Sequence, residues 1–308
     1  MMSTAPVRVA LIPDHDPHLA EAITSAGGEI VDLADARALV WTGDTAGFPS
    51  PLPDHIEWVQ LRLAGIESFL NAGLLDDKRI WTNASGFYAE NVAEHALALL
   101  LAGLRQINVA VTRHWDKQAI DTAVRSLHGS TVAIIGAGGI ARSLIPRLRA
   151  CGADVLAVNH SGRPVEGARD TYPSSRLDEV WSRCDHVVLA APSTDETRHL
   201  INETTLAKLP SHAWIVNVAR GPLVDEDALH TALTTGVIAG AALDVTDPEP
   251  PAVDHPLWDL PNVIITPHVA NPSSGLTRTL APWVAENLRR FAAGGADMLA
   301  RVDPNASY

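Results

Sequence analysis

The sequence predicts an α/β protein built from two doubly wound parallel-sheet domains. Short apolar, β-branched runs alternate with helical patterns over the first hundred residues, and a second series of this kind begins near residue 130. A glycine-rich turn follows the first strand of the second series. The chain has 308 residues, which is enough for two ordinary domains with full cores.

The first series predicts a small parallel sheet covered by helices. "VRVALIP" at 7–13 is a short apolar run that ends in proline, which is typical of a buried strand. The next segment, "PHLAEAITSAGGEI", has a helical pattern closed by glycine, and "ALVWTG" and "IEWVQLR" are further strand candidates. Residues 91–114 have the pattern of one long helix, and its first half is apolar almost all round, so we expect it to be buried.

The second series predicts a larger parallel sheet. Five or six strand-like runs are separated by helical patterns: "STVAIIG", "GADVLAVN", "CDHVVLAAP", "HAWIVNVARG", "VIAGAALDV" and "NVIITPHVA". A last helix from about Thr277 to Phe291 should return to the first domain, since chain ends often lie close together. We therefore expect one domain over 1–100 plus 276–308 and a dinucleotide-binding domain over 101–275.

Composition excludes several classes of partner. The net charge is −13, which disfavours a nucleic-acid partner because readers of the phosphate backbone carry basic surfaces. The longest apolar run, at 96–104, is far too short to cross a bilayer, and "MMSTAPVRVALIPD" lacks the pattern of a signal peptide. The two cysteines, Cys151 and Cys184, have neither metal-site nor disulfide spacing. We expect a cytoplasmic protein without a membrane partner.

A phosphate-binding loop is predicted in "TVAIIGAGGIARSL". Gly136, Gly138 and Ala141 fit the G-x-G-x-x-G/A pattern, with Gly139 and Ile140 between them. The first glycine allows a tight turn, the second lets the backbone approach a pyrophosphate, and the small third residue lets the helix pack on the strand. The helix N-terminus then faces the phosphates. A glycine-rich turn that binds nothing is the alternative, but the strand–helix–strand context favours a dinucleotide site.

Three polar residues follow predicted strands, at the sheet edge where doubly wound folds bind ligands. Arg220 follows "WIVNVA", Glu249 lies in the proline-rich loop "DVTDPEPP", and His268 follows "NVIITP". In isolation each has an ordinary structural role: an arginine at a strand end is often a surface ion-pair partner. Their shared edge makes them candidates for one site.

Taken together, these segments resemble those of the D-isomer-specific 2-hydroxyacid dehydrogenases. The resemblance is carried by "VAIIGAGGIA", "VNVARGPLVDEDAL", "ALDVTDPEPP" and "HPLWDLPNVIITPHVA", with "EWVQLRLAGIESF" and "NVAEHALALLLAGLR" earlier in the chain. It covers nearly the whole chain, with the motifs in order. It implies a flavodoxin-like substrate domain, a Rossmann nucleotide-binding domain and a homodimer.

The resemblance assigns catalysis to Arg220, Glu249 and His268. A guanidinium can bind the carboxylate of a 2-keto acid through two hydrogen bonds and polarise its carbonyl. His268 can protonate the carbonyl oxygen or, in reverse, remove that proton. A hydrogen bond from Glu249 to the other ring nitrogen would orient the ring and favour the imidazolium form. The nicotinamide cofactor supplies the hydride.

Other positions are carried over from the family. The loop Ala64, Gly65 and Ile66 should offer backbone N–H groups to the substrate carboxylate. Further cofactor contacts are expected at Pro192, Thr197, Val218, Ala219 and Asp244. Phe87 and Tyr88 depart from the family's small residues and either line the substrate pocket or pack between domains. Glu94 and His95 lack a metal-binding continuation, so we assign no metal.

The strand ending "AVNHSGRP" indicates the cofactor. NAD-selective relatives usually have an aspartate at the position of Asn159, which repels a 2′-phosphate. Here Ser161 and Arg163 can bind such a phosphate, and His160 can assist if protonated. We expect NADP to be preferred. The alternative is a solvated turn, with Arg163 in water and NAD as the cofactor.

The substrate prediction is a small 2-keto acid. The wording of "WVQLRLAGIESF" is most similar to the glyoxylate/hydroxypyruvate reductase branch. Two alternatives stay open. One is a phosphoglycerate-type dehydrogenase that lacks a regulatory domain, and the other is a non-catalytic, dinucleotide-sensing binding protein.

Overall fold

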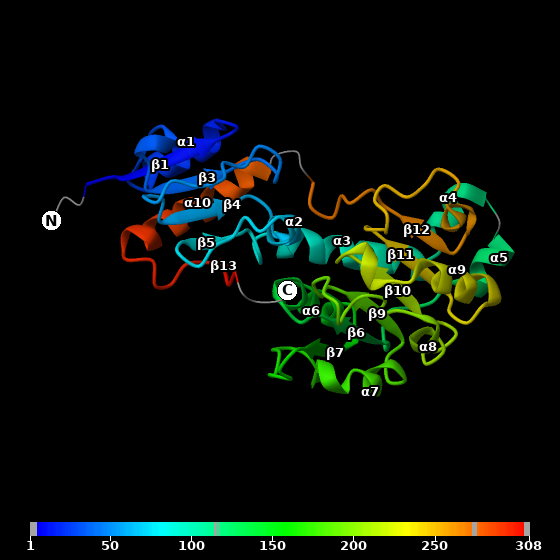
Figure 1. The fold of residues 1–308 in the computed structure, drawn as a ribbon. Coiled ribbons are helices and arrows are strands. Elements are labelled where there is room, and N and C mark those ends of the chain that lie inside the picture. The colour runs from blue at the N-terminus through cyan, green and yellow to red at the C-terminus, as the bar shows by residue number, and fades with distance from the viewer. Residues whose placement is uncertain (1–4, 114, 116, 273–275, 305–308) are drawn as a thin grey trace. The chain divides into compact units, whose positions relative to one another are not determined.

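The computed structural model describes residues 5–113, 115, 117–272 and 276–304. The chain divides into two compact units, one made of Met1–Tyr88 with Pro272–Tyr308 and the other of Ala89–Asn271. Residues 1–4 of the chain lie outside the described residues, and so does residue 114, the last residue of the helix predicted over 91–114. Figure 1 labels the helices and strands of both units.

The first unit contains a six-stranded sheet in the order β13-β5-β4-β3-β1-β2. Five of the strands run parallel, and β13 pairs antiparallel to β5. The order β2-β1-β3-β4-β5 is that of flavodoxin-like folds. The elements are β1 (Val7–Ile12), α1 (Pro17–Ser25), β2 (Gly28–Ile30), η1 (Leu33–Asp35), β3 (Ala38–Trp41), β4 (Trp58–Leu61), α2 (Glu67–Asn71), β5 (Ile80–Thr82), α10 (Leu276–Ala292) and β13 (Arg301–Val302).

The C-terminal helix belongs to this first unit. Helix α10 packs beside α1 (Figure 1). Asn287 of α10 is fully buried and donates to the side chain of Gln60 in β4 at 2.8 Å. Its Oδ1 accepts from the N–H of Leu299 at 2.7 Å. Because these buried polar atoms are paired, the network fixes how the returning helix meets the sheet.

The second unit contains a seven-stranded, fully parallel sheet in the order β12-β11-β10-β9-β6-β7-β8. This is the Rossmann order, extended by one strand, and it confirms the predicted fold class. The strands are β6 (Thr131–Ile135), β7 (Asp154–Asn159), β8 (Asp170–Pro173), β9 (His186–Leu189), β10 (Trp214–Asn217), β11 (Gly240–Leu243) and β12 (Val263–Ile265).

The predicted single helix over 91–114 was wrong, because the structure has two helices there. Gln106 takes a left-handed backbone with φ 54°, and its side chain donates to the carbonyl of Gly103 at 2.9 Å. This local cap ends the first helix. The helices of the unit are α3 (Ala89–Leu104), α4 (Ile107–Arg113), α5 (Lys117–Ala123), α6 (Gly139–Ala150), η2 (Ser174–Arg176), α7 (Asp178–Trp181), α8 (Glu203–Leu206), η3 (Gly221–Leu223), α9 (Glu226–Thr235) and η4 (Pro256–Asp259).

Helix α3 packs on the sheet of the second unit over a buried tryptophan. A Cβ on Gly103 of α3 would lie 2.3 Å from the ring of Trp214, and one on Gly240 of β11 would lie 2.4 Å from the same ring. Glycine at both positions therefore lets the ring fit between helix and strand. Since all of α3 groups with this unit, the expected domain boundary at residue 100 falls inside the helix, and the division lies at Tyr88–Ala89. The roles of the two units stay predictions.

The described residues contain no membrane-spanning helix, no metal-binding cluster and no disulfide. No described helix combines the length and the apolar character needed to cross a bilayer. Among the same residues, no group of three or more His, Cys, Asp or Glu is placed to hold a metal ion. Cys151 and Cys184 are free thiols.

Candidate active site

The carboxyl ends of three neighbouring parallel strands bring the predicted polar residues to one sheet edge. Strands β10, β11 and β12 are adjacent and parallel. Arg220 follows β10, Asp244 follows β11 directly, and His268 follows β12. In a doubly wound sheet this edge is where ligands bind. The fold therefore gathers side chains that the sequence separates by dozens of residues.

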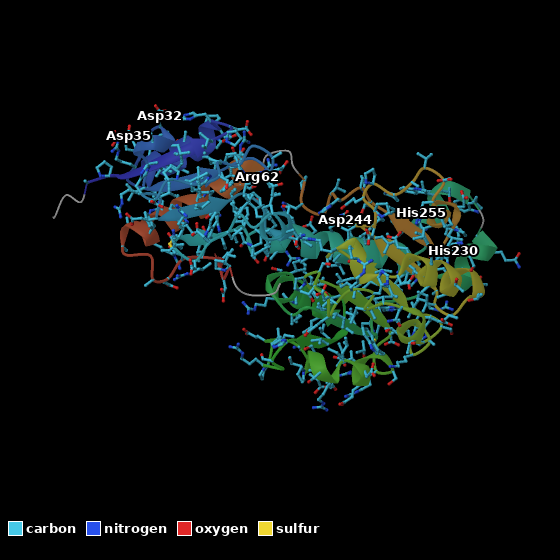
Figure 2. The ribbon with its side chains drawn as sticks, in the orientation of Figure 1. Asp32, Asp35, Arg62, His230, Asp244 and His255 are labelled. Atoms are coloured by element: carbon cyan, nitrogen blue, oxygen red, sulfur yellow. The ribbon has the colours of Figure 1, made fainter. Side chains whose placement is uncertain are left out.

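The carboxylate of Asp244 organises the turn that carries His268. Asp244 is 1% exposed, and its Oδ1 accepts from the hydroxyl of Thr266 at 2.6 Å and from the N–H of Val269 at 2.9 Å. Its Oδ2 accepts from the N–H of Ala270 at 2.9 Å. The backbone N–H of His268 donates to the carbonyl of Asp244, also at 2.9 Å. These bonds hold the turn from both sides of His268. Figure 2 labels Asp244.

His268 itself has a left-handed backbone with φ 50°. A non-glycine residue pays a conformational penalty for this geometry, which persists only when surrounding contacts determine it. The bonds to Asp244 are those contacts.

His95 and Thr266 complete this network and were not identified from the sequence. The Nε2 of His95, on α3, lies 3.1 Å from the hydroxyl of Thr266 and 3.3 Å from Oδ1 of Asp244. A histidine at 22% side-chain exposure beside a buried carboxylate can supply a balancing hydrogen bond. The position of His95 on a nearly all-apolar helix was the available signal, because a polar group there needs a partner.

His268 and Glu249, which the sequence predicts to be catalytic, lie within hydrogen-bonding distance of each other. The Nδ1 of His268 lies 2.9 Å from Oε1 of Glu249. The side chains are 52% and 41% exposed, so the pair is accessible to a reactant. With Nδ1–H donating to the carboxylate, Nε2 is the nitrogen left to exchange a proton. The geometry is that of a general acid–base oriented by a carboxylate.

Arg220 is presented by a short, rigid segment after β10. The side chain of Asn217 donates to the carbonyl of Arg220 at 2.9 Å and accepts from the N–H of Ala219 at 3.0 Å. The next residue, Gly221, has no room for a side chain, since a Cβ would lie 1.9 Å from the carbonyl oxygen of Thr246. This close approach holds the Arg220 segment against the start of the loop that carries Glu249.

The glycine-rich loop has the geometry that a dinucleotide requires. Gly136 has φ 100°, and a Cβ there would lie 2.4 Å from the backbone of Ala191, so only glycine fits. At Gly138 a Cβ would meet no protein atom within 4 Å. Packing therefore does not explain glycine at Gly138, whereas close approach of a pyrophosphate does. Ala141 is fully buried, as the helix–strand contact demands.

The N-terminus of α6 points at this open space. Gly139 and Ile140 are its first two residues, and the first N–H groups of a helix have no intrahelical partner. They carry the positive end of the helix dipole. The loop and the helix start therefore fit the negatively charged pyrophosphate of a dinucleotide cofactor.

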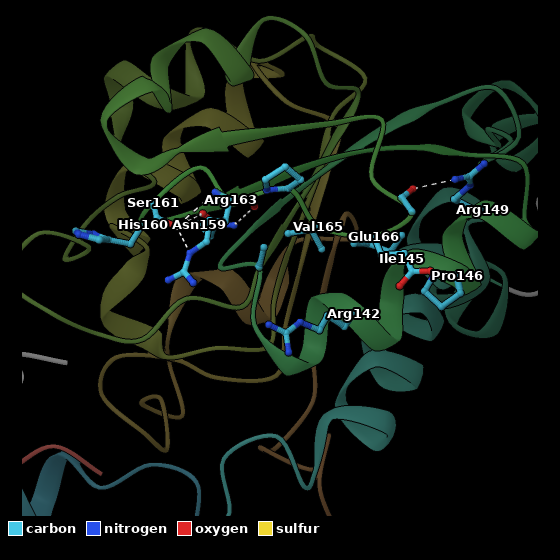
Figure 3. Close-up of a pocket in the computed structure, with 13 residues that line it drawn as sticks. Arg142, Ile145, Pro146, Arg149, Asn159, His160, Ser161, Arg163, Val165 and Glu166 are labelled. Carbon is cyan, nitrogen blue, oxygen red and sulfur yellow. Dashed lines mark hydrogen bonds between the residues drawn. The ribbon is translucent and has the colours of Figure 1, made fainter. Parts of the chain in front are cut away.

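The segment after β7 lines a cavity of about 1010 Å³. Asn159 donates from Nδ2 to the carbonyl of Arg163 at 2.8 Å, and Nε of Arg163 donates to Oγ of Ser161 at 3.2 Å. His160 lines the same cavity. The structure thus uses Asn159 to fold the loop, a role the sequence did not suggest. Figure 3 shows Arg163 on this loop and Arg142 on α6, with Arg149 and Glu166 farther along the cavity.

Four predicted cofactor contacts have internal bonds in the structure. The hydroxyl of Thr197 donates to the carbonyl of Pro192 at 2.7 Å, which closes the loop after β9. The N–H of Val218 donates to the carbonyl of Leu189, and the N–H of Ala219 donates to Oδ1 of Asn217. The contacts of these residues with a cofactor stay predictions.

The predicted substrate loop lies in the first unit. Among the described residues, no acceptor is recorded for the N–H groups of Ala64, Gly65 and Ile66. Two side chains hold the loop in place. Nδ2 of Asn83 donates to the carbonyl of Ala64 at 2.7 Å, and the hydroxyl of Tyr88 donates to the carbonyl of Arg62 at 2.8 Å. These three N–H groups suit an anion such as a carboxylate.

Tyr88 supports the loop that precedes these N–H groups. It is 7% exposed, and burial raises the pKa of its phenol well above the usual range, so it stays a hydrogen-bond donor. Phe87 packs edge-on against Tyr88 and against Trp283 within the same unit. Whether either ring also lines a substrate pocket stays a prediction.

Comparison with known proteins relates these features to one family. Residues 96–270 match the NAD binding domain of the D-isomer specific 2-hydroxyacid dehydrogenases. A protein from the proB 3′ region of Corynebacterium melassecola is 40% identical over 300 residues, covering 95% of this chain and 98% of that protein. The glyoxylate reductase of Thermofilum pendens is 36% identical over 284 residues, covering 90% of this chain and 78% of the enzyme.

A solved structure is similar over almost the full length. It is the NADPH-dependent glyoxylate/hydroxypyruvate reductase of Sinorhizobium meliloti in complex with NADP and sulfate. The TM-score is 0.80 at 28% identity, and the match covers 99% of this chain and 100% of that one.

A matched pair of glycine variants tests the phosphate loop. Gly138→Ala should leave the melting temperature unchanged, because the new methyl group meets no protein atom. It should weaken dinucleotide binding by about 10-fold or more, because the methyl occupies the space into which the pyrophosphate fits. Gly136→Ala should instead lower the melting temperature. Calorimetry and cofactor titration measure both effects; a Gly138→Ala protein with undiminished affinity would contradict this site.

Proposed function

The chain belongs to the D-isomer specific 2-hydroxyacid dehydrogenase family, and we propose that it reduces a small 2-keto acid with NADPH as hydride donor. The observation that carries the proposal is the pair of His268 and Glu249, 2.9 Å apart on the sheet edge that also presents Arg220. Glyoxylate and hydroxypyruvate are the substrates we favour. The reverse reaction would oxidise the corresponding 2-hydroxy acid.

Each residue of the pair has a distinct part in the proposed reaction. Nε2 of His268 gives a proton to the keto oxygen as the carbon is reduced, and it takes the proton back in the reverse direction. Glu249 holds the ring through Nδ1 and favours the protonated imidazole. The nicotinamide cofactor, when bound, supplies the hydride.

Anion binding is assigned to two groups of donors. The guanidinium of Arg220 is always charged and can hold the substrate carboxylate through two parallel hydrogen bonds. The N–H groups of Ala64, Gly65 and Ile66 are a second source of donors. Among the described residues these N–H groups have no hydrogen-bond acceptor, which supports that role. Each of these groups of donors suits a carboxylate.

The substrate class is supported by relatives and by chemistry. The Thermofilum pendens enzyme is a glyoxylate reductase, and the Sinorhizobium meliloti enzyme acts on glyoxylate and hydroxypyruvate. Tyr88 donates to the carbonyl of Arg62, just before the predicted carboxylate loop, and Phe87 packs against Tyr88. We propose that these rings border the substrate site, which would favour a keto acid with a small side chain.

The preference for NADPH is supported by the loop after β7. Asn159 carries no charge that would repel a 2′-phosphate, and its hydrogen bond to Arg163 organises the loop. Ser161 and Arg163 line the cavity of about 1010 Å³ and can donate to a phosphate. The Sinorhizobium meliloti structure contains NADP. The homodimer and the cytoplasmic location stay predictions from the family resemblance.

A panel of keto acids tests the proposed activity. Purified protein should oxidise NADPH with glyoxylate or hydroxypyruvate, more slowly with phenylpyruvate, and weakly or not at all with phosphohydroxypyruvate. His268→Gln should lower kcat by about 10²-fold or more, since a proton donor is lost. Its affinity for NADPH should remain, because His268 is not among the phosphate-binding residues. Absorbance at the nicotinamide band and fluorescence titration report the two quantities.

The panel also distinguishes the rival functions. Activity confined to phosphohydroxypyruvate would indicate the phosphoglycerate-type alternative. Cofactor binding without turnover of any keto acid would indicate a dinucleotide-sensing protein. Wild-type turnover in the His268→Gln variant would remove His268 from the reaction.

Cofactor preference is tested by Arg163→Ala, with Arg149→Ala as the control. Arg149 lines the same cavity but donates to the carbonyl of Gly167 at 3.1 Å, far along α6. Arg163→Ala should raise the Kd of NADPH by about 10-fold or more, the loss expected for one hydrogen bond to a charged group. The Kd of NADH should change little. Arg149→Ala should leave the ratio of the two Kd values unchanged, and equal losses for both cofactors in Arg163→Ala would refute the preference.

A further inference from the structure

A nearly buried carboxylate of the second unit has no part in the reaction as described so far. Glu226 is the first residue of α9, and its side chain is only 9% exposed. Burying a carboxylate is unfavourable unless it is paired or hydrogen-bonded. Burial raises the pKa of Glu226, while its hydrogen bond from Asp247 and the nearby His255 oppose that rise. A residue kept at this cost calls for a structural reason.

The contacts of Glu226 lie on one loop. Its Oε1 accepts from the backbone N–H of Asp247 at 3.0 Å. Its Oε2 lies 3.1 Å from Nε2 of His255, a close contact without the alignment of a hydrogen bond. Asp247 and His255 stand on either side of Glu249 in the chain (His255 is labelled in Figure 2). Glu226 therefore holds the loop before and after the residue that contacts His268.

The loop has few other means of holding its shape. Pro248, Pro250 and Pro251 have no N–H groups, so the backbone on both sides of Glu249 cannot form a regular hydrogen-bond pattern. Other contacts of the loop among the described residues are the bond from the hydroxyl of Thr246 to the carbonyl of Pro248 at 3.0 Å, an ion pair between Asp247 and Arg198 at 3.9 Å, and the bond from Nε1 of Trp258 in η4 to the carbonyl of Ala252 at 3.0 Å. The contacts of Glu226 tie the loop to the α-helix α9.

The position of the His255 ring beside Glu226 is supported by a hydrogen bond at its other nitrogen. Nδ1 of His255 accepts from the N–H of Leu257 at 3.4 Å and caps η4, which leaves Nε2–H to face Glu226. The His255 ring attracts the charge of Glu226, and Asp247 and Asp227 repel it. The carboxylate is thus held by one hydrogen bond from a backbone N–H and by a close contact with the His255 ring.

We propose that Glu226 is a positioning residue that acts through Glu249: it fixes the proline-rich loop so that the Glu249 carboxylate meets Nδ1 of His268. This inference rests on the proposed roles of Glu249 and His268. Glu226 does not contact the reacting atoms. Its loss should lower the rate of the proton-transfer step and leave substrate binding, which is assigned to Arg220 and the 64–66 loop, intact.

A double-mutant cycle tests the proposal. Glu226→Ala should lower kcat by about 10-fold or more, as expected when a catalytic group is displaced by about 1 Å, while KM and the Kd of NADPH stay within about twofold. Glu226→Gln keeps an oxygen for the Asp247 N–H and should recover part of kcat. In a Glu249→Gln background, Glu226→Ala should have no further effect, because the residue through which it acts is gone.

The control is Asp227→Asn. Asp227 is exposed in the same turn of α9, and the variant removes a charge there without touching the loop, so kcat should stay at the wild-type value. NADPH titration gives the fraction of folded protein in every sample. A merely structural defect would lower kcat by the same factor in both backgrounds, and that result would overturn the inference.

The remaining outcomes separate this inference from the proposed function. A large loss in Glu249→Gln, together with wild-type kcat in Glu226→Ala, overturns the role of Glu226 alone. Wild-type kcat in Glu249→Gln overturns the proposed role of Glu249, and the role of Glu226 with it.

Discussion

The hydrogen bonds to the Asp244 carboxylate are the interaction on which the candidate site depends. A buried charge is tolerated only when donors surround it, and here the hydroxyl of Thr266 and the N–H groups of Val269 and Ala270 do so. These donors come from the turn that carries His268. The same bonds that satisfy the charge therefore impose the left-handed backbone at His268.

The parallel sheet makes this arrangement possible. Because β10, β11 and β12 are adjacent and parallel, residues that follow them meet at one edge. Glycine at Gly221 then lets two of the connecting segments approach closely, since a Cβ would collide with the carbonyl of Thr246. The site is thus positioned in two layers: Asp244 holds the turn of His268 from inside, and we propose that Glu226 holds the loop of Glu249 from the first turn of α9.

Much of the fold could be predicted from the sequence because its signals are local. The apolar runs at β6, β7, β9, β10 and β11 are short, β-branched and bounded by turn residues, and the phosphate loop has a fixed spacing of small residues. The short strands β5 and β13 have too few residues to form a recognisable pattern, and β8, with the sequence DTYP, lacks an apolar run. The break at Gln106 depends on a single left-handed residue inside an otherwise helical pattern.

Sequence reasoning could point only to those members of the candidate site that carry the proposed chemistry. Arg220, Glu249 and His268 stand out because charged groups follow strand ends, and their pattern resembles a known family. The supporting residues do not stand out. His95 looks like one polar position on a helix, and its contact with Thr266 and Asp244 arises only when α3 packs on the sheet.

Amide hydrogen exchange in the protein without ligand tests the role of Asp244 most directly. If its carboxylate holds the turn, the amides of His268, Val269 and Ala270 exchange slowly in the wild-type protein. In Asp244→Asn an NH₂ group replaces one acceptor oxygen and faces backbone donors. These three amides should then exchange about 10-fold faster or more, because a lost hydrogen bond to a charged group costs about 1.5–3 kcal/mol. The amides of β10 should be unaffected. Unchanged protection of the three amides in Asp244→Asn would contradict the account.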